Sequence, residues 1–361
     1  MKIFLKRLLY FIPIPLLIIL VNYFEDPANL FNDKYMLGIA NYLAQGYNVT
    51  NVRDCDERLL QKYFIEKMSE CPTEIVLGPS TVQLINNSYS IEKHFINNGV
   101  GYASLEDYLA IFYLYEKKGC KIKKVLLGLG PWLLNDNNDL SRWKVLGNEY
   151  SIFLNKLLKN TVVINTEFRI HQYVKFKELV SFSYFKTSLS FYLRKKVSKK
   201  YKPTKISVNE GFTRLKDGSV CYEALYRNAS MDEVEKKAKS DLMAANPIYP
   251  LGNFTHLSEH YKLIFSNFVE YLQKQNVEVE FFLSPFHPIV YEYFKKNNYY
   301  HIVFKTENYF KDYASSRKIK VFGSYDPVKY NFDNSYFFDG WHPNEKAIEK
   351  MLKSDNKSTN E

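Results

Sequence analysis

The sequence lacks the local patterns that mark the common metal, nucleotide and nucleic-acid sites. Its four cysteines, Cys55, Cys71, Cys120 and Cys221, form no C-x-x-C pair, so we expect no zinc site and no other metal centre. A glycine-rich loop followed by lysine, which would cradle a phosphate, is also missing. No nucleic-acid-binding motif accompanies the basic residues. These absences predict a protein without a cofactor and without a nucleic-acid partner.

The cysteines leave the existence of a disulfide open. Cys55 and Cys71 are the nearest pair in sequence, and a disulfide between them is allowed outside the cytoplasm. Free, buried cysteines are an equally good interpretation.

Positive charge is in excess over the 361 residues, with 49 Lys and Arg against 39 Asp and Glu, a formal net charge of +10. The densest cluster runs from Arg194 to Lys202. It would suit an anionic lipid surface or an anionic glycan. A solvated basic helix end explains it at least as well.

The N-terminal residues predict a membrane anchor. Lys2, Lys6 and Arg7 precede an apolar run from Leu8 to Phe24, close to the lower limit of about 17 residues for a spanning helix. The basic residues lie before the run and acids follow it, so we expect the rest of the chain outside the cytoplasm. No small-x-small cleavage site ends the run, which favours an uncleaved anchor over residues 1–24 rather than a signal peptide.

Strand and helix patterns alternate over residues 25–352, which predicts an α/β domain. Strands are expected at 74–78, near 98–101, at 124–130, at 277–283 and at 318–322. Helices are expected at 56–69, from about Ser80, at 105–117, 258–275, 307–317 and 345–352. Because helices separate the strands, the pattern predicts a five-stranded parallel sheet with helices on both faces.

The interval between the third and fourth strands is too long for a simple crossover. Residues 137–252 are therefore predicted to be a large insertion after the third strand. Within it, Asp217-Gly218 predicts a hairpin over 213–222. Because the insertion follows a strand end, we expect it to form a lid or a substrate wall over the site. The polar residues 353–361 are expected to be a disordered tail.

Two separated motifs supply a nucleophile and its base. Ser80 follows an apolar strand and the turn Gly78-Pro79, and Asp339 precedes His342 by three positions. With this spacing the carboxylate can hold the imidazole in one tautomer while the second ring nitrogen faces a nucleophile. Both motifs follow a predicted strand end, where the sites of open parallel sheets form. We therefore predict a catalytic triad of these three residues.

Each motif also has a purely structural interpretation. Ser80 and Gln83 have the spacing of a helix capping box. Asp339 suits a turn, and His342-Pro343 suits the start of a helix. The order of the motifs and their shared placement favour the catalytic interpretation.

These blocks resemble the SGNH/GDSL hydrolase superfamily. The resemblance rests on Gly78-Pro79-Ser80, on Asn98-Gly99-Val100-Gly101 and on Asp339-x-x-His342, and covers roughly residues 24–350. It is closest to membrane-anchored bacterial SGNH-like proteins encoded with cell-surface polysaccharide machinery.

The resemblance implies a flavodoxin-like, three-layer α/β/α fold and a serine esterase or O-acyltransferase, with acetyl as the expected acyl group. Its substrate would be a cell-envelope or surface glycan. The site would lie outside the cytoplasm of a bacterium, with the N-terminal helix in membrane lipid. A membrane acyl-transfer protein would be a possible partner.

The oxyanion donors implied by the resemblance are the N–H groups of Ser80 and Gly101 and the side chain of Asn135. Gly99 is close enough to Gly101 to be the alternative glycine of the second block. The sequence departs from the family here. Pro79 stands where the first block usually has Asp, and Asn135 lies farther from Gly128 than the third block's Gly-x-Asn-Asp allows. These weakened blocks keep a second class of function open, a non-catalytic SGNH-like module that binds a glycan or acts as a scaffold.

Three further residues are predicted near the cleft. Trp341 and Trp132 would stack on sugar rings, although aromatic residues in such loops more often serve packing. His287 follows the fourth strand. It would either bind substrate or fix the Pro-rich turn.

Overall fold

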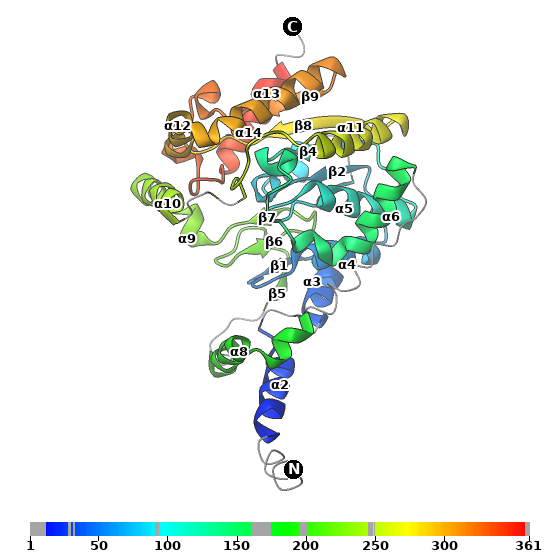
Figure 1. The fold of residues 1–361 in the computed structure, drawn as a ribbon, viewed down its shortest axis with the longest axis vertical. Helices are drawn as coiled ribbons and strands as arrows, with labels where there is room; N and C mark the ends of the chain where they lie inside the picture. Colours follow the sequence, from blue (N-terminus) through cyan, green and yellow to red (C-terminus); the bar gives the residue numbers. More distant parts are fainter. Residues whose placement is uncertain are drawn as a thin grey trace, which may run out of the picture.

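The computed structural model describes residues 12–27, 30–31, 33–90, 94–159, 175–194, 201–244, 248 and 250–357. These residues form an α/β structure around a five-stranded parallel sheet in the order β3-β2-β4-β8-β9 (Figure 1). Its strands are β2 (Glu74–Leu77), β3 (Phe95–Asn97), β4 (Lys124–Gly128), β8 (Glu278–Leu283) and β9 (Lys320–Gly323). The predicted α/β class and five-stranded parallel sheet are confirmed.

Both faces of this sheet are buried, which explains the apolar strand sequences. Ile75 and Leu77 of β2 contribute to one core, and Val76 between them contributes to the other. Since successive side chains of a strand point to opposite faces, each central strand supplies both cores.

Helices on one face of the sheet build the larger core: α3 (Lys34–Ala44), α4 (Glu57–Lys67), α5 (Leu105–Lys118), α6 (Gly147–Leu158), α11 (Glu259–Lys274), α12 (Pro288–Lys296) and α13 (His301–Ser316). On the other face, α14 (Glu345–Lys357) packs with loops through Ala347, Ile348 and Met351. The chain therefore has helices on both sides of the sheet (Figure 1).

Local sequence explains where the helices next to the site begin. The side chain of Asp56 accepts the N–H groups of Arg58 and Leu59 at the start of α4. Ser104 and Asp107 form a capping box at the start of α5. These caps satisfy N–H groups that would otherwise be unpaired.

A second, antiparallel sheet was not predicted. It has the order β5-β1-β6-β7, made by β5 (Lys202–Thr204), β1 (Asn48–Thr50), β6 (Thr213–Arg214) and β7 (Val220–Cys221). The predicted hairpin around Asp217-Gly218 is present as β6 and β7. Because β1 precedes the parallel sheet and its partners lie within residues 137–252, the insertion is tied to the N-terminal part of the domain.

The other described residues of the insertion are mostly helical. Besides α6 and short 3-10 turns, the insertion contains α8 (Phe182–Arg194), α9 (Ala224–Arg227) and α10 (Met231–Ala244). Residues 195–200 of the predicted basic cluster lie outside the described part of the chain.

The helix predicted from about Ser80 is wrong beyond its first turn. Only a 3-10 turn, η1 (Ser80–Val82), forms. The side-chain amide of Asn97 donates to the carbonyl oxygens of Val82 and Ile85, at 2.7 Å each. These bonds hold the chain in a loop and leave Val82 and Ile85 buried in the smaller core.

Three other boundaries also differ from the sequence prediction. The helix predicted at 307–317 is α13, which covers His301–Ser316 and so begins earlier than predicted. The second strand lies at Phe95–Asn97, so residues 98–101 form the loop after it. The last helix continues to Lys357 instead of ending at Leu352, so the tail predicted from residue 353 is helical at its start. Residues 358–361 of that tail lie outside the described residues.

The N-terminal helix α2 covers Pro13–Glu25. Within the described part of the chain, no helix has both the length and the apolar character needed to cross a membrane. Residues 1–11 of the predicted anchor lie outside the described residues.

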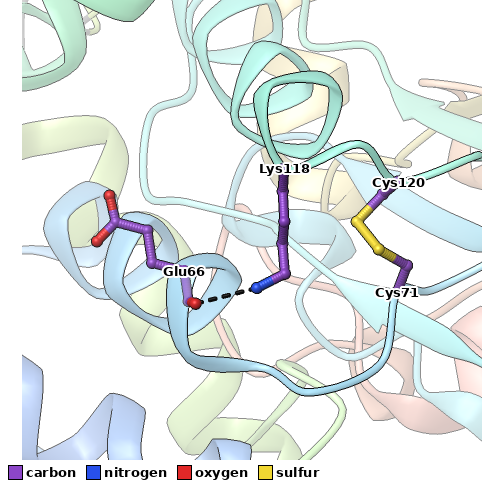
Figure 2. Close-up of a disulfide and its surroundings, with 4 residues drawn as sticks. All are labelled: Glu66, Cys71, Lys118 and Cys120. Atoms are coloured by element: carbon purple, nitrogen blue, oxygen red, sulfur yellow. Dashed lines mark hydrogen bonds between the residues drawn. A yellow bond between two sulfur atoms is a disulfide. The ribbon is translucent and has the colours of Figure 1, made fainter.

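A disulfide joins Cys71 to Cys120, which differs from the Cys55–Cys71 pair that is closest in sequence (Figure 2). It connects the segment before β2 to the segment after α5. Cys55 and Cys221 are free. The pairing follows from parallel topology, because the start of β2 lies beside the start of β4.

Candidate active site

The site lies at the carboxyl end of the parallel sheet, where the strand order reverses between β2 and β4. Ser80 follows β2 directly, after the Gly78-Pro79 turn. A side chain on Gly78 would meet the backbone of Gly128 at 3.1 Å and Val82 at 2.7 Å. Glycine is therefore required for the two strand ends to approach each other.

Ser80, His342 and Asp339 are connected by hydrogen bonds. Ser80 Oγ lies 2.9 Å from His342 Nε2. His342 Nδ1 lies 3.0 and 2.9 Å from the two carboxylate oxygens of Asp339. With Nδ1 donating to the carboxylate, Nε2 is left as the acceptor for the Ser80 hydroxyl.

The backbone fixes this carboxylate. Asp339 Oδ1 accepts the N–H groups of Trp341 at 2.8 Å and His342 at 2.9 Å. The acid thus closes a local turn and orients the imidazole with the same side chain. The turn role and the imidazole-orienting role expected for Asp339 are therefore compatible.

The charges of the pair shift both pKa values. Burial alone would raise the pKa of Asp339, but the charge and hydrogen bonds of His342 outweigh it and hold this pKa below its usual value. Burial would lower the pKa of His342, but the Asp339 carboxylate raises it above its usual value. The arrangement stabilises the imidazolium form of His342, the species that a histidine forms when it acts as the base for a serine.

Two side chains from the insertion border the imidazole. The ring of Tyr222 lies 6.0 Å from that of His342, between centroids. Asp241 on α10 accepts the backbone N–H of Gly340 at 3.0 Å. The insertion therefore reaches the Asp339–His342 loop.

The predicted oxyanion donor at Gly101 is engaged by a protein carboxylate. Its N–H donates to Glu57 of α4. Glu57 also accepts from Gln83 at 2.7 Å and from Arg214 at 2.6 Å. The Gln83 amide and the buried Arg214 cation thus hold a negative charge against the Gly101 N–H. Burial alone would raise the pKa of Glu57, but the charge of Arg214 and the hydrogen bonds from Gly101, Gln83 and Arg214 outweigh burial and hold this pKa below its usual value.

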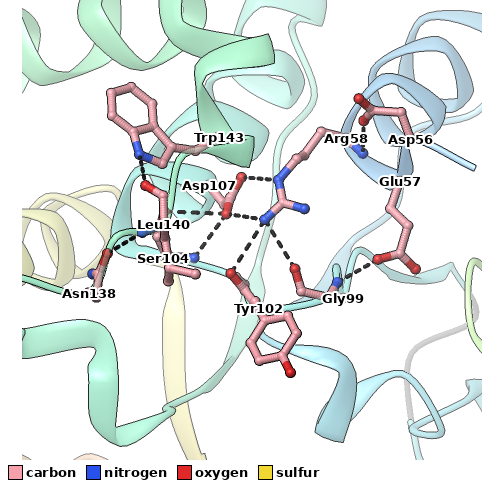
Figure 3. A network of polar contacts seen from close by, with 12 residues as sticks. Asp56, Glu57, Arg58, Gly99, Tyr102, Ser104, Asp107, Asn138, Leu140 and Trp143 are labelled. Atoms are coloured by element: carbon pink, nitrogen blue, oxygen red, sulfur yellow. Dashed lines mark hydrogen bonds and ion pairs between the residues drawn. The ribbon is translucent and has the colours of Figure 1, made fainter. Parts of the chain in front are cut away.

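A buried ion pair supports the same loop (Figure 3). The guanidinium of Arg58 binds both carboxylate oxygens of Asp107, at 2.8 Å each. It also donates to the carbonyl oxygens of Gly101 at 3.2 Å and Tyr102 at 3.4 Å. Arg58 therefore fixes the backbone at Gly101 and Tyr102, at the end of the segment Asn98–Gly101.

The predicted donor at Asn135 is also engaged. Its amide nitrogen donates to the carbonyl oxygens of Pro250 and Gly252, at 3.2 Å each. Its amide oxygen accepts the N–H of Asn137, and the residue is 1% exposed. Because a side-chain amide has two hydrogens, Asn135 has none left for an oxyanion in this arrangement.

The Ser80 N–H differs from these two donors, since the described residues provide no acceptor for it. It is therefore the predicted oxyanion donor that remains free.

Of the two predicted aromatic contacts, Trp132 lies closer to the loop after β3. Its indole N–H donates to the carbonyl oxygen of Ala103 at 2.8 Å, and its ring lies 6.3 Å from that of Tyr102. Trp341 packs against Phe286 and Phe294. Both tryptophans are partly buried and serve packing. Tyr102 is 41% exposed and supplies an open aromatic surface.

His287 is fully buried. Its ring Nδ1 accepts the backbone N–H of Ile289 at the start of α12. Its backbone N–H donates to the carbonyl oxygen of Gly340 at 3.2 Å. Burial lowers its pKa to about 4. These contacts favour the role of fixing the Pro-rich turn over direct substrate binding.

Sequence reasoning missed Glu57, Arg214, Tyr222 and Asp241. Each comes from an element remote in sequence from the motifs, and none carries a local pattern. Only a complete topology, which shows the elements that reach the carboxyl edge of the sheet, could have identified these residues.

No cluster of His, Cys, Asp and Glu suited to a metal ion is present among the described residues. Comparison with models of known protein families gives no match for this chain, and comparison with curated proteins gives none either.

Proposed function

We propose that this protein is a serine esterase or O-acyltransferase, with acetyl as the expected acyl group. The observation that carries the proposal is the hydrogen-bonded series from Ser80 through His342 to Asp339 at the carboxyl end of the sheet. The strand order β3-β2-β4-β8-β9 has the flavodoxin-like pattern, which supports the resemblance to SGNH hydrolases.

In the proposed reaction, Ser80 Oγ attacks an ester carbonyl while His342 Nε2 takes its proton. Asp339 stabilises the resulting imidazolium. The oxyanion would be held by the Ser80 N–H, while Gly101 would contribute only if Glu57 moved away. His342 then returns its proton to the leaving alcohol, and the acyl-enzyme passes its acyl group to water or to a sugar hydroxyl.

The proposed substrate is a cell-envelope or surface polysaccharide. Support comes from the resemblance and from the partly exposed Tyr102, since an aromatic face suits a sugar ring. In the same proposal, the N-terminal helix anchors the protein in a bacterial membrane, with the site outside the cytoplasm. A membrane acyl-transfer protein would supply the acyl group where the reaction is a transfer.

The test is labelling of the full-length protein by a fluorophosphonate, together with acetyl release from a chromogenic ester. We expect Ser80→Ala to abolish labelling and both Ser80→Ala and His342→Ala to abolish acetyl release. Ser69→Ala, at an exposed serine away from the motifs, should retain both. Labelling that persists in Ser80→Ala would refute the assignment of the nucleophile.

A second candidate function is a non-catalytic glycan-binding or scaffold module. It is favoured by one specific observation, that the Gly101 N–H and the Asn135 amide are both bonded to protein acceptors. This function predicts no labelling of Ser80 in the folded protein. It also predicts that Ser80→Ala binds a polysaccharide as well as the parent does.

A further inference from the structure

The N-terminal helix α2 and the η5–α8 segment are in contact and together form one assembly. Both of its parts expose apolar side chains. On α2, Leu17 is 57% exposed and Phe24 is 72% exposed. In the second segment, Val180 of η5 (Lys175–Val180) is 63% exposed and Leu193 of α8 is 68% exposed. Such a concentration of large exposed apolar residues is unusual for a surface in water.

The two parts of this assembly are joined by polar groups on the inside. The side-chain nitrogen of Asn22 lies 2.9 Å from the carbonyl oxygens of Glu178 and Leu179. Ser188 of α8 donates to the Asn22 side-chain oxygen at 3.2 Å. Asn22 and Ser188 are both fully buried. The amide thus adds hydrogen bonds to the carbonyl oxygens of Leu179 and Glu178 at the end of η5, the second of which also accepts the Ser181 N–H.

The hydrogen bonds of Asn22 explain why α2 and α8 are in contact. Asn22 lies within the apolar run Leu8–Phe24, where an unpaired amide in lipid would be costly. Tyr184 of α8 adds a second tie by donating to Asp26 at 2.8 Å. Figure 1 shows α2 and α8 side by side, at the end of the molecule opposite α13 and α14.

The exposed surface of α8 is divided into two stripes. Phe182, Leu189 and Leu193 recur at helical spacing and are all exposed. Ser183, Thr187 and Ser190 recur on a different side of the same helix. The helix is therefore amphipathic in the manner of helices that lie in a membrane interface.

We propose that η5 and α8 form a second membrane-contacting element, which lies in the lipid interface beside α2. The inference rests on the membrane anchor proposed above and not on the esterase chemistry. If the apolar run containing α2 enters lipid, then α8, which is hydrogen-bonded to its last turns, is held at the membrane surface.

The charged residues of η5 and α8 favour contact of this surface with lipid over contact with another protein. Lys177 and Lys186 are exposed on η5 and α8. The densest basic cluster of the sequence, Arg194 to Lys202, begins at the last residue of α8. Basic residues beside an apolar stripe match the anionic headgroups of a membrane surface.

The test uses the full chain in vesicles of phosphatidylcholine and phosphatidylglycerol. Cys55→Ser and Cys221→Ser remove the free thiols. Single cysteines are then introduced by Leu189→Cys, Leu193→Cys or, as the matched control on the polar stripe, Thr187→Cys, and each is labelled with the fluorophore NBD. Flotation of the vesicles first reports whether the chain is anchored.

We expect the labels at 189 and 193 to be quenched by nitroxides on the lipid acyl chains and reduced several-fold more slowly by aqueous dithionite than the label at 187. Equal dithionite reduction at 187 and 189 in floating vesicles would overturn the inference while leaving the anchor intact. Protection from dithionite without quenching by lipid nitroxides would also overturn it, because a protein surface or a second copy of the chain would then cover α8. Failure to float would refute the anchor, and the inference with it.

Discussion

Gly101 donates its backbone N–H to the carboxylate of Glu57, and the same carboxylate binds the buried guanidinium of Arg214. The N–H that the family resemblance assigns to an oxyanion is thus paired with a fixed negative charge. An oxyanion can reach it only when Glu57 moves or is replaced. The position of Glu57 therefore determines whether the Gly101 N–H can serve as an oxyanion donor.

Glu57→Ala should lower the free energy of unfolding by about 3 kcal/mol, because it leaves the Arg214 charge buried without its partner. The Arg214 side chain is 2% exposed and that of Glu57 is 21% exposed. Glu57→Gln retains an acceptor and should cost less. Urea unfolding of the two variants measures the difference. In an Arg214→Met background, the loss caused by Glu57→Ala should shrink, and an unchanged loss would contradict the pairing.

The pKa of His342 should lie above the value of about 6.5 that is typical of histidine, because the nearby Asp339 carboxylate outweighs burial. Asp339→Asn should bring it down. The imidazole resonances, followed by NMR over pH, report this without any need for activity. A midpoint that is unchanged in Asp339→Asn would show that the carboxylate does not set the shift.

The same shift has consequences for rate and stability. If the esterase proposal holds, kcat/KM should rise with pH through the His342 pKa, since the neutral imidazole is the base. Because the folded-state pKa is raised, protonated His342 contributes stability that is fully present below about pH 6.5 and is lost as pH rises through the folded-state pKa.

Asn135→Ala should reduce stability more than it reduces the rate. The Asn135 amide holds Pro250 and Gly252, so its loss leaves buried carbonyls unpaired at a cost of about 1–3 kcal/mol each. A thermal unfolding scan alongside the ester assay separates the two effects. A fall in kcat of about 10²–10³-fold without a change in stability would instead identify Asn135 as an oxyanion donor.

Asp107→Asn should destabilise the protein by about 3–5 kcal/mol, since it leaves Arg58 as an uncompensated buried charge. The two side chains are 0% and 4% exposed. The matched control is Glu259→Gln, which breaks a pair with Lys262 in which the Glu259 side chain is 84% exposed. That change should cost no more than about 1 kcal/mol. Equal losses in urea unfolding would contradict the contrast.

Replacing Cys71 and Cys120 together by serine should lower the free energy of unfolding by about 2–4 kcal/mol, because the bond closes a loop between residues 49 positions apart. Thiol titration of the unreduced, unfolded protein should find two thiols, from Cys55 and Cys221. Four thiols would rule out the bond. Burial raises the pKa of the Cys55 thiol to about 12, so it should react slowly until the protein unfolds.

Much of the parallel sheet was predictable because its strands are short apolar runs between helical patterns. β2, β4 and β8 lie within one to two residues of their predicted limits. The helix expected after Ser80 failed because Asn97, from a neighbouring strand, takes up the carbonyls of Val82 and Ile85. A hydrogen bond between two different elements leaves no periodic signal in sequence.

The candidate site likewise has one part that the local sequence predicted and another that it did not. Asp339 and His342 are three residues apart, so one turn fixes their hydrogen bond and the local spacing predicted it. The oxyanion assignments depended on which acceptors surround Gly101 and Asn135. Those acceptors, Glu57 and the carbonyl oxygen of Pro250, come from other elements.

The sequence by itself determined the α/β class, the five strands and the local Asp339–His342 pair, since these follow from apolar periodicity and short spacing. The shared strand-end placement of the two motifs predicted that Ser80 meets His342, 262 positions away, and the fold brings Ser80 Oγ to 2.9 Å from His342 Nε2. Tertiary structure alone decided that Cys71 pairs with Cys120. It also decided that Asn22 joins α2 to α8. The physical reason is that burial and hydrogen bonding between distant segments depend on how the elements pack, and a one-dimensional pattern records only which faces each element must bury.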